Sequence, residues 1–185
     1  MIITQRLCLR PLRIEDIDQL LALDNDPRVT RWLNGGTAVS RNEMLDQILP
    51  RLLLASERPP GIGVYIAQLR DTAEFIGWFG IFPPVPPREL PGFGVRLSHH
   101  SWGVGYGLEG GRALIEHTFA STGVPAIEAT TYEENRASRA LLHRIGFIET
   151  ERFRYQPDQA AETETFVADE MSVWPGEDLR FILKR

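Results

Sequence analysis

The chain has 185 residues, of which 43% are hydrophobic and 24% charged, with a formal net charge of −5, which is typical of one globular domain spanning residues 1–185. The negative net charge and the lack of any block of basic residues argue against a general nucleic-acid binder. No apolar run is long enough for a membrane span or a signal peptide, and Cys8 is the single cysteine, so we expect a cytoplasmic protein with no membrane, disulfide or metal site.

The first half of the chain contains strands and two helices. Alternating apolar and polar residues up to Leu12 predict a strand, and helical spacing predicts a helix after it. Ser40 and Glu43 form a capping box for a second helix, which Pro50 should kink or break. Three further strands are predicted at 63–69, 74–82 and 93–97. The last two are joined by a connection with five prolines, residues 82–91.

The second half predicts a β-α-β-α unit followed by two strands. The spacing predicts a helix at 107–122 and a strand at 126–132. Asn135 caps a helix that ends at Gly146, where a left-handed residue is expected. Residues 153–174 are predicted to form two strands around a polar loop. The element order indicates an α/β (α+β) fold with a largely antiparallel first half.

A glycine-rich loop lies between a strand and a helix. Gly103, Gly105 and Gly107 lie within five residues, which allows a tight turn and the close approach of a ligand. The first N–H groups of a helix are unpaired and carry partial positive charge. The loop therefore predicts a pyrophosphate site made of backbone donors, although a connection without a ligand has the same pattern.

Residues 105–110 also match the G-x-G-x-x-G dinucleotide fingerprint, and Glu128 lies near the position of a ribose-binding acid. Three observations argue against that interpretation. Residues 98–104 separate the loop from its strand, only 75 residues follow Gly110, and the first half lacks alternating strands and helices. A P-loop is excluded because no Gly-Lys-Ser or Gly-Lys-Thr exists.

Two motifs in this order resemble the GNAT superfamily of N-acetyltransferases, and within it the branch of Rim-type ribosomal-protein N-acetyltransferases. They are SWGVGYGLE at 101–109, and NRAS at 135–138 followed by RIGF at 144–147. Residues 5–12 and 25–29 add weaker likeness, and the resemblance extends from about Thr4 to Trp174. It implies a GNAT-like mixed, mostly antiparallel sheet of six to seven strands with a central splay, flanked by about four helices.

The resemblance implies acetyl-CoA as co-substrate, with its pantetheine arm in the splay and its pyrophosphate on the glycine loop. The cofactor-binding residues implied are Val95, Arg96, Leu97, Trp102, Gly103, Val104, Gly105, Tyr106, Gly107, Leu108, Asn135 and Ser138. In similar enzymes a backbone N–H near Leu97 stabilises the oxyanion, and Ser138 assists the leaving thiolate. The alternative for Ser138 is a hydroxyl that bonds to the start of its helix.

Several positions depart from the family pattern. Leu142 replaces a tyrosine that serves many relatives as the acid, and Gly92 replaces a glutamate common in the Rim-type branch. His99 and His100 are substitute bases or, more simply, surface residues. Tyr132, Glu133 and Glu134 either face the site or only end a strand. The candidate walls of the acceptor site, which equally suit packing, are Trp32, Trp78, Phe79 and Tyr155.

We therefore expect an N-acetyltransferase in which a primary amine attacks the thioester directly. The amine is either a protein N-terminus or a small molecule, and the sequence does not select between them. The alternative is a module that binds acyl-CoA with little catalysis, and a dinucleotide-dependent oxidoreductase is least favoured. A homodimer stays open as an assembly.

Overall fold

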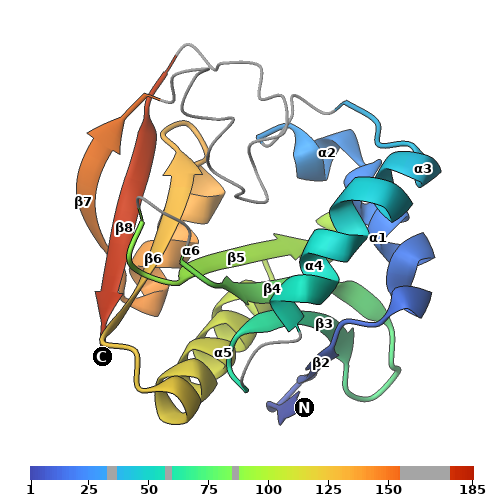
Figure 1. Cartoon of the computed structure of the whole chain (residues 1–185), viewed down its shortest axis with the longest axis horizontal. Coiled ribbons are helices and arrows are strands. Elements are labelled where there is room, and N and C mark those ends of the chain that lie inside the picture. Colours follow the sequence, from blue (N-terminus) through green and yellow to red (C-terminus); the bar gives the residue numbers. More distant parts are fainter. Residues whose placement is uncertain (33–36, 57–59, 85–87, 155–175) are drawn as a thin grey trace.

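The computed structural model describes residues 1–32, 37–56, 60–84, 88–154 and 176–185. These residues form one mixed sheet with helices on both faces (Figure 1). The strands are β1 Ile2–Ile3, β2 Leu7–Pro11, β3 Gly63–Leu69, β4 Phe75–Phe82, β5 Gly92–Leu97, β6 Ala126–Tyr132, β7 Ile148–Phe153 and β8 Asp178–Lys184. Their order in the sheet is β1-β2-β3-β4-β5-β6-β8-β7. Every pairing is antiparallel except that of β5 with β6.

The helices are α1 Ile17–Asp24, α2 Pro27–Thr30, α3 Arg41–Glu43, α4 Leu49–Ser56, α5 Tyr106–Thr122 and α6 Arg136–Ile145. A π-helical turn, Met44–Ile48, joins α3 to α4, so the described residues contain five separate helices besides the short 3₁₀ turns Ile14–Asp16 and His99–Ser101. Pro50 therefore does not end the helix that begins after Ser40. Proline crowds the carbonyl of the preceding turn, and we infer that the wider π turn just before Pro50 accommodates it.

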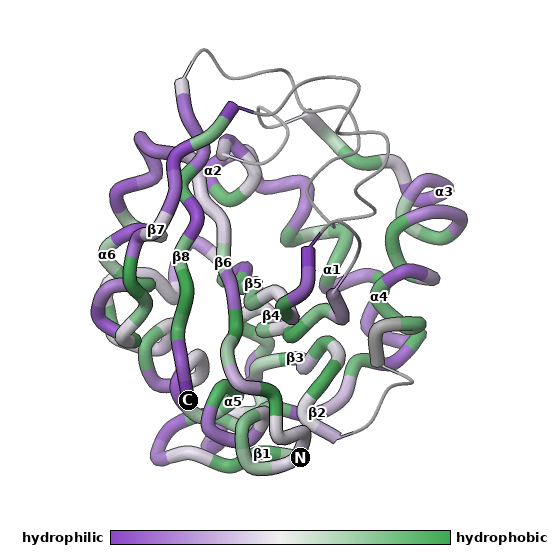
Figure 2. The backbone as a smooth tube through the Cα atoms, turned by 60° about the vertical axis from the view of Figure 1, so that its left-hand side comes forward, coloured by the Kyte–Doolittle hydropathy of each residue, from purple (hydrophilic) through white to green (hydrophobic). Residues whose placement is uncertain are grey.

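The sheet has eight strands in the described part of the chain, so the expectation of six to seven was wrong. β1 has two residues, which is too short for an alternation signal. β7 is an edge strand with mostly exposed side chains. The sequence predicts no strand at its position and instead predicts two strands within residues 153–174. The last strand is Asp178–Lys184 instead, and residues 155–174 lie outside the described residues. Figure 2 shows the contrast between hydrophobic β4 and the largely hydrophilic β7.

Two hydrophobic cores cover the two faces of the sheet. One contains Phe79, Leu114 and Phe181 and lies beneath α5 and α6, and the other contains Leu20, Met44 and Ile66 beneath α1 and α4. A Cβ atom at Gly110 would lie 2.4 Å from the ring of Phe79. This last glycine of the G-x-G-x-x-G pattern therefore allows α5 to pack closely on the sheet.

The sheet is open at its centre, as the resemblance implied. β5 and β6 are parallel, and their register contains the single pair Gly92 and Glu128. The N–H of Glu128 donates to the carbonyl of Pro91 at 2.9 Å, and the two strands diverge beyond that point. The divergence creates the site described below. In the part of the chain that the structure describes, no helix combines the length and apolar character needed to cross a bilayer.

Candidate functional site

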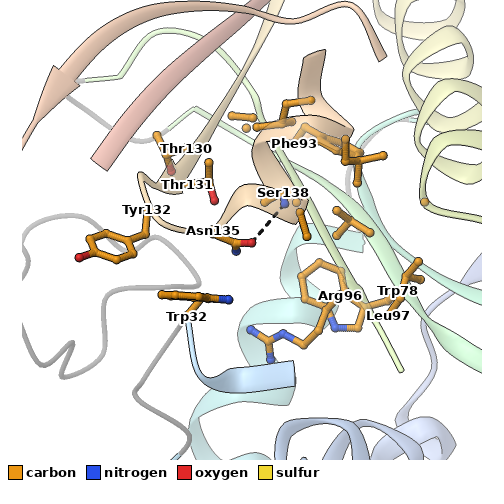
Figure 3. Close-up of a pocket in the computed structure, with 18 of the residues that line it drawn as sticks. Trp32, Trp78, Phe93, Arg96, Leu97, Thr130, Thr131, Tyr132, Asn135 and Ser138 are labelled. Atoms are coloured by element: carbon orange, nitrogen blue, oxygen red, sulfur yellow. Dashed lines mark hydrogen bonds between the residues drawn. The ribbon is translucent and has the colours of Figure 1, made fainter. Parts of the chain in front are cut away.

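A cavity of about 750 Å³ opens where β5 and β6 diverge. β5, β6, the start of α6 and the glycine loop line it, together with aromatic residues from the other face of the sheet (Figure 3). All of the predicted cofactor-binding residues line it except Val104. Val104 is 50% exposed, and its carbonyl accepts a hydrogen bond from Arg6 Nη1 at 3.0 Å. The chain thus brings the two sequence motifs to one place.

The backbone of β5 presents donors to this cavity. The amide of Ser98 bonds to Ile76 on β4, while the carbonyl of Pro91 accepts from Glu128 on β6. Successive residues direct their backbone groups to opposite sides of a strand. The N–H groups of Val95 and Leu97 therefore face the cavity, whereas that of Arg96 faces β4.

The glycine loop approaches the cavity at the N-terminus of α5. Gly103 and Gly105 have φ of +76° and +92°, a region that L-residues adopt at a cost. Helix α5 begins at Tyr106, so its first amides have no partner within the helix. The indole of Trp102 donates to the carbonyl of Leu97 at 2.8 Å and fixes the start of the loop to β5. The loop therefore presents unpaired donors and partial positive charge to the cavity.

Sequence reasoning missed the residues that hold this loop. Glu109 on α5 accepts hydrogen bonds from the Thr4 hydroxyl at 2.6 Å, and from the backbone N–H and Nε of Arg6, both at 2.7 Å. Burial raises the pKa of Glu109, but the bonds from Thr4 and Arg6 outweigh it and hold the pKa below its ordinary value. Since Arg6 also bonds to Val104, the turn between β1 and β2, residues 4–6, fixes the loop. No local pattern signals a contact between residues 103 positions apart.

At the start of α6, the side chain of Asn135 caps the helix and the side chain of Ser138 lines the cavity. Asn135 Oδ1 accepts from the N–H of Ser138 at 3.1 Å, which caps the helix (Figure 3). The structure shows no hydrogen bond from the Ser138 hydroxyl to any described residue, so it does not cap the helix. Ser138 lines the cavity instead.

The other side of the cavity contains aromatic and charged residues. Trp32 and Trp78 line it, and the ring of Trp32 lies 5.7 Å from that of Tyr132 (Figure 3). Phe79 is fully buried in the core and forms no wall, because it faces α5. Tyr155 lies outside the described residues.

The cavity lining excludes four of the remaining candidates, His99, His100, Glu133 and Glu134, but includes Tyr132. His99 packs on Trp102 with ring centroids 4.9 Å apart, and His100 Nε2 lies 3.2 Å from exposed Glu74. Glu133 Oε1 accepts from the N–H of Glu177 at 2.9 Å, and Glu134 is exposed. Tyr132 lines the cavity, and burial raises its pKa, with Glu134 and Glu133 adding to the rise.

Two carboxylates line the cavity among the described residues, Glu128 and Asp178. Glu128 is 3% exposed and lies 3.6 Å from Arg88 Nη1 and 3.2 Å from Arg180 Nε. Burial raises the pKa of Asp178 to about 6; Arg88 opposes the rise and Glu133 adds to it. These carboxylates lie on β6 and β8, on the face of the sheet that Tyr132 shares.

Comparison with known proteins gives one family. Residues 6–148 match the acetyltransferase (GNAT) domain. The chain is 31% identical over 158 residues to the FsC-acetyl coenzyme A-N(2)-transacetylase of Aspergillus fumigatus, covering 81% of this chain and 66% of that protein. The structures of two more distant proteins share the fold.

One is a spermidine N-acetyltransferase from Vibrio cholerae, in complex with CoA and spermine. It has a TM-score of 0.74 at 13% identity, over 98% of this chain and 96% of that one. The other is an acetyl transferase from Salmonella typhimurium that modifies the N-terminal serine of ribosomal protein L7/L12. Its TM-score is 0.75 at 16% identity, over 98% and 96% of the two chains.

Replacing Glu109 with alanine tests whether the turn between β1 and β2 fixes the glycine loop. The change removes hydrogen bonds to a charged acceptor, so we expect the free energy of unfolding to fall by about 2–3 kcal/mol. Glu116→Ala on the exposed side of the same helix is the control, with an expected change under about 0.5 kcal/mol. Urea unfolding measures both, and equal effects would contradict the assignment.

The raised pKa of Asp178 predicts a specific dependence of stability on pH. Its folded pKa of about 6 exceeds the ordinary aspartate pKa of 3.8, so the native state binds more protons than the unfolded state between these two pH values. Stability therefore falls as pH rises through this window. Asp178→Asn should be more stable than the wild type at pH 7 by about 1 kcal/mol, after allowance for solvent screening, and equally stable near pH 4. Thermal unfolding at both pH values checks this, with exposed Asp71→Asn as the control.

Proposed function

The chain belongs to the GNAT acetyltransferase family, and from that premise we propose that it moves the acetyl group of acetyl-CoA to a primary amine. The observation that carries the proposal is the cavity between β5 and β6, which joins unpaired strand donors to the N-terminus of α5. A thioester on a long arm ending in phosphates matches such a site. The strand donors suit the amide-containing arm, and the helix N-terminus suits the anion.

We infer the following placement of acetyl-CoA. The pantetheine arm lies along β5 and bonds to the N–H groups of Val95 and Leu97. The pyrophosphate binds the backbone amides of residues 104–108, where the positive end of α5 attracts it. The side chain of Asn135 contacts the arm through Nδ2, since Oδ1 caps α6. The acceptor enters from the opposite side, past Trp32 and Trp78.

The chemistry then follows from the groups nearest the thioester. The amine nitrogen attacks the carbonyl carbon, and the N–H of Leu97 stabilises the oxyanion; losing one such donor typically costs about 100-fold or more in rate. Ser138, whose hydroxyl is not used for capping, gives its proton to the leaving thiolate and is reprotonated from solvent. Leu142 has a hydrocarbon side chain that packs in the core at 3% exposure, so this position supplies no acid. Ser138 lies three residues after Asn135, where the Rim-type branch has its serine, and this match supports our placing the chain in that branch.

A module that binds acyl-CoA with little catalysis is the second candidate. This candidate is favoured by Gly92 and Leu142, because neither side chain can transfer a proton. Release of CoA thiol in the presence of primary amines separates the two. The panel should include spermidine and a peptide with a free N-terminus, because the relatives named above differ in acceptor.

Gly105→Asp tests the phosphate-binding loop. The substitution places a negative charge at the proposed pyrophosphate site, so we expect acetyl-CoA affinity to fall at least about 100-fold by calorimetry. Gly123→Asp is the matched control. Gly123 also has a left-handed backbone, with φ of +71°, but it ends α5 away from the cavity. If both variants bind acetyl-CoA as the wild type does, the loop assignment is wrong.

Ser138→Ala tests the proton donor. We expect kcat to fall about 10- to 100-fold with acetyl-CoA affinity nearly unchanged, because the hydroxyl acts on the leaving group. Steady-state thiol release measures kcat, and calorimetry measures affinity. Wild-type turnover in this variant would reduce Ser138 to a residue that only lines the cavity.

A further inference from the structure

The carboxylate of Glu128 is buried in the cavity with one oxygen unsatisfied. Glu128 is 3% exposed, and its Oε1 has no hydrogen-bond partner among the residues that the structure describes. Arg88 Nη1 lies 3.6 Å from Oε1, beyond hydrogen-bond distance. Arg180 Nε lies 3.2 Å from Oε2 but forms no hydrogen bond within the described part of the chain. A buried acceptor without a donor is costly, and such groups in native proteins call for a specific explanation.

The position of Glu128 suggests what satisfies it. Glu128 is the register partner of Gly92, at the point where β5 and β6 begin to diverge. Residues opposite one another on neighbouring strands present their side chains to the same face, and strands lie about 4.8 Å apart. A Cβ atom built at Gly92 would meet nothing within 4 Å. The carboxylate therefore borders open space at the closed end of the gap.

The other acidic groups nearby have different surroundings. Asp24 forms an ion pair and a hydrogen bond with Arg96. Glu151 pairs with Arg180 and is 51% exposed. Asp178, on β8, is the register partner of Tyr132, which lies four residues after Glu128 on β6. Glu128 alone among these combines deep burial, a place in the cavity lining and an oxygen without a hydrogen bond.

We propose that Glu128 receives the acceptor amine: its Oε1 accepts a hydrogen bond from the ammonium group and takes one proton from it before attack. The inference rests on the proposed function and assigns the base that function requires. Arg88 and Arg180 stabilise the carboxylate by Coulomb attraction while the cavity is empty. Their charges are shared with Asp178 and Glu151, so the cluster is not cationic overall.

The step balances as follows. The ammonium gives one proton to Glu128, and the free lone pair forms the new N–C bond at the thioester carbonyl. The C–S bond breaks, and its electron pair leaves with sulfur. The nitrogen then loses a second proton to solvent, while the thiolate takes a proton from Ser138, which solvent replaces. The products are the amide, the CoA thiol and one proton released from Glu128 to solvent.

Glu128→Gln tests the proposal because it keeps the shape and removes the charge. We measure kcat/KM for the amine between pH 6.5 and 10, using the panel amine that the wild type acetylates fastest. We expect a loss of about 100-fold near pH 7 that shrinks to about 10-fold or less once the free amine is already neutral. Acetyl-CoA affinity should change by less than about 3-fold, because the proposed cofactor contacts come from β5, the glycine loop and Asn135, and not from Glu128.

Two further variants separate catalysis from folding. Glu151→Gln makes the same substitution in the exposed partner of Arg180, outside the cavity lining, and should keep kcat/KM within about 2-fold. The double variant Glu128→Gln with Gly92→Glu removes the carboxylate from β6 and places one on β5, in the open space beside Gly92. It should regain at least about 10-fold in kcat/KM over the single variant.

Three results would overturn the inference. One is wild-type kcat/KM in Glu128→Gln. Another is a loss that is equal at every pH and is accompanied by weaker acetyl-CoA binding and lower thermal stability, which indicates a structural role. The third is a pH-dependent loss found in Asp178→Asn and not in Glu128→Gln. Absence of transfer by the wild type to every amine in the panel would overturn the proposed function itself.

Discussion

The failure of β5 and β6 to pair beyond Gly92 and Glu128 is the constraint on which the rest of the structure depends. Each strand is held on its other side, β5 by β4 and β6 by β8, so the gap does not weaken the sheet as a whole. The two cores fix the faces on either side. Backbone donors that would be costly without partners are thereby held open for a ligand.

The N-terminus of α5 lies at the open end of this gap, and its orientation is set from two directions. Trp102 bonds to Leu97, and Arg6 with Glu109 fixes the loop to the first strands. Glycine at 110 allows α5 to approach Phe79 closely. The proposed cofactor side is thus built mainly from backbone, while the proposed acceptor side is built from paired charges and aromatic rings. We infer that the former is insensitive to side-chain identity, and that the latter sets which amine binds.

Most strands and helices were predictable because their signals are local. The capping box of Ser40 and Glu43 marks the start of a helix, and the left-handed Gly146 marks the end of another. Each signal is contained in a stretch of at most four residues. Exposed β7 was missed because an edge strand lacks an alternating pattern. The candidate site was predictable where it rests on the glycine loop and on Asn135. Long-range geometry was not: the sequence suggested Glu128 only as the acid of a dinucleotide site, and its pairing with Gly92 arises from the sheet register.

The most direct measurement is amide hydrogen exchange of the segment 92–98 with and without acetyl-CoA. If the pantetheine arm occupies the gap, the amides of Val95 and Leu97 gain hydrogen-bond partners and their exchange slows. NADH at the same concentration should leave exchange unchanged, because the sheet is not a dinucleotide fold. Unchanged exchange in this segment at saturating acetyl-CoA would contradict the account, since the gap would then not be the binding site.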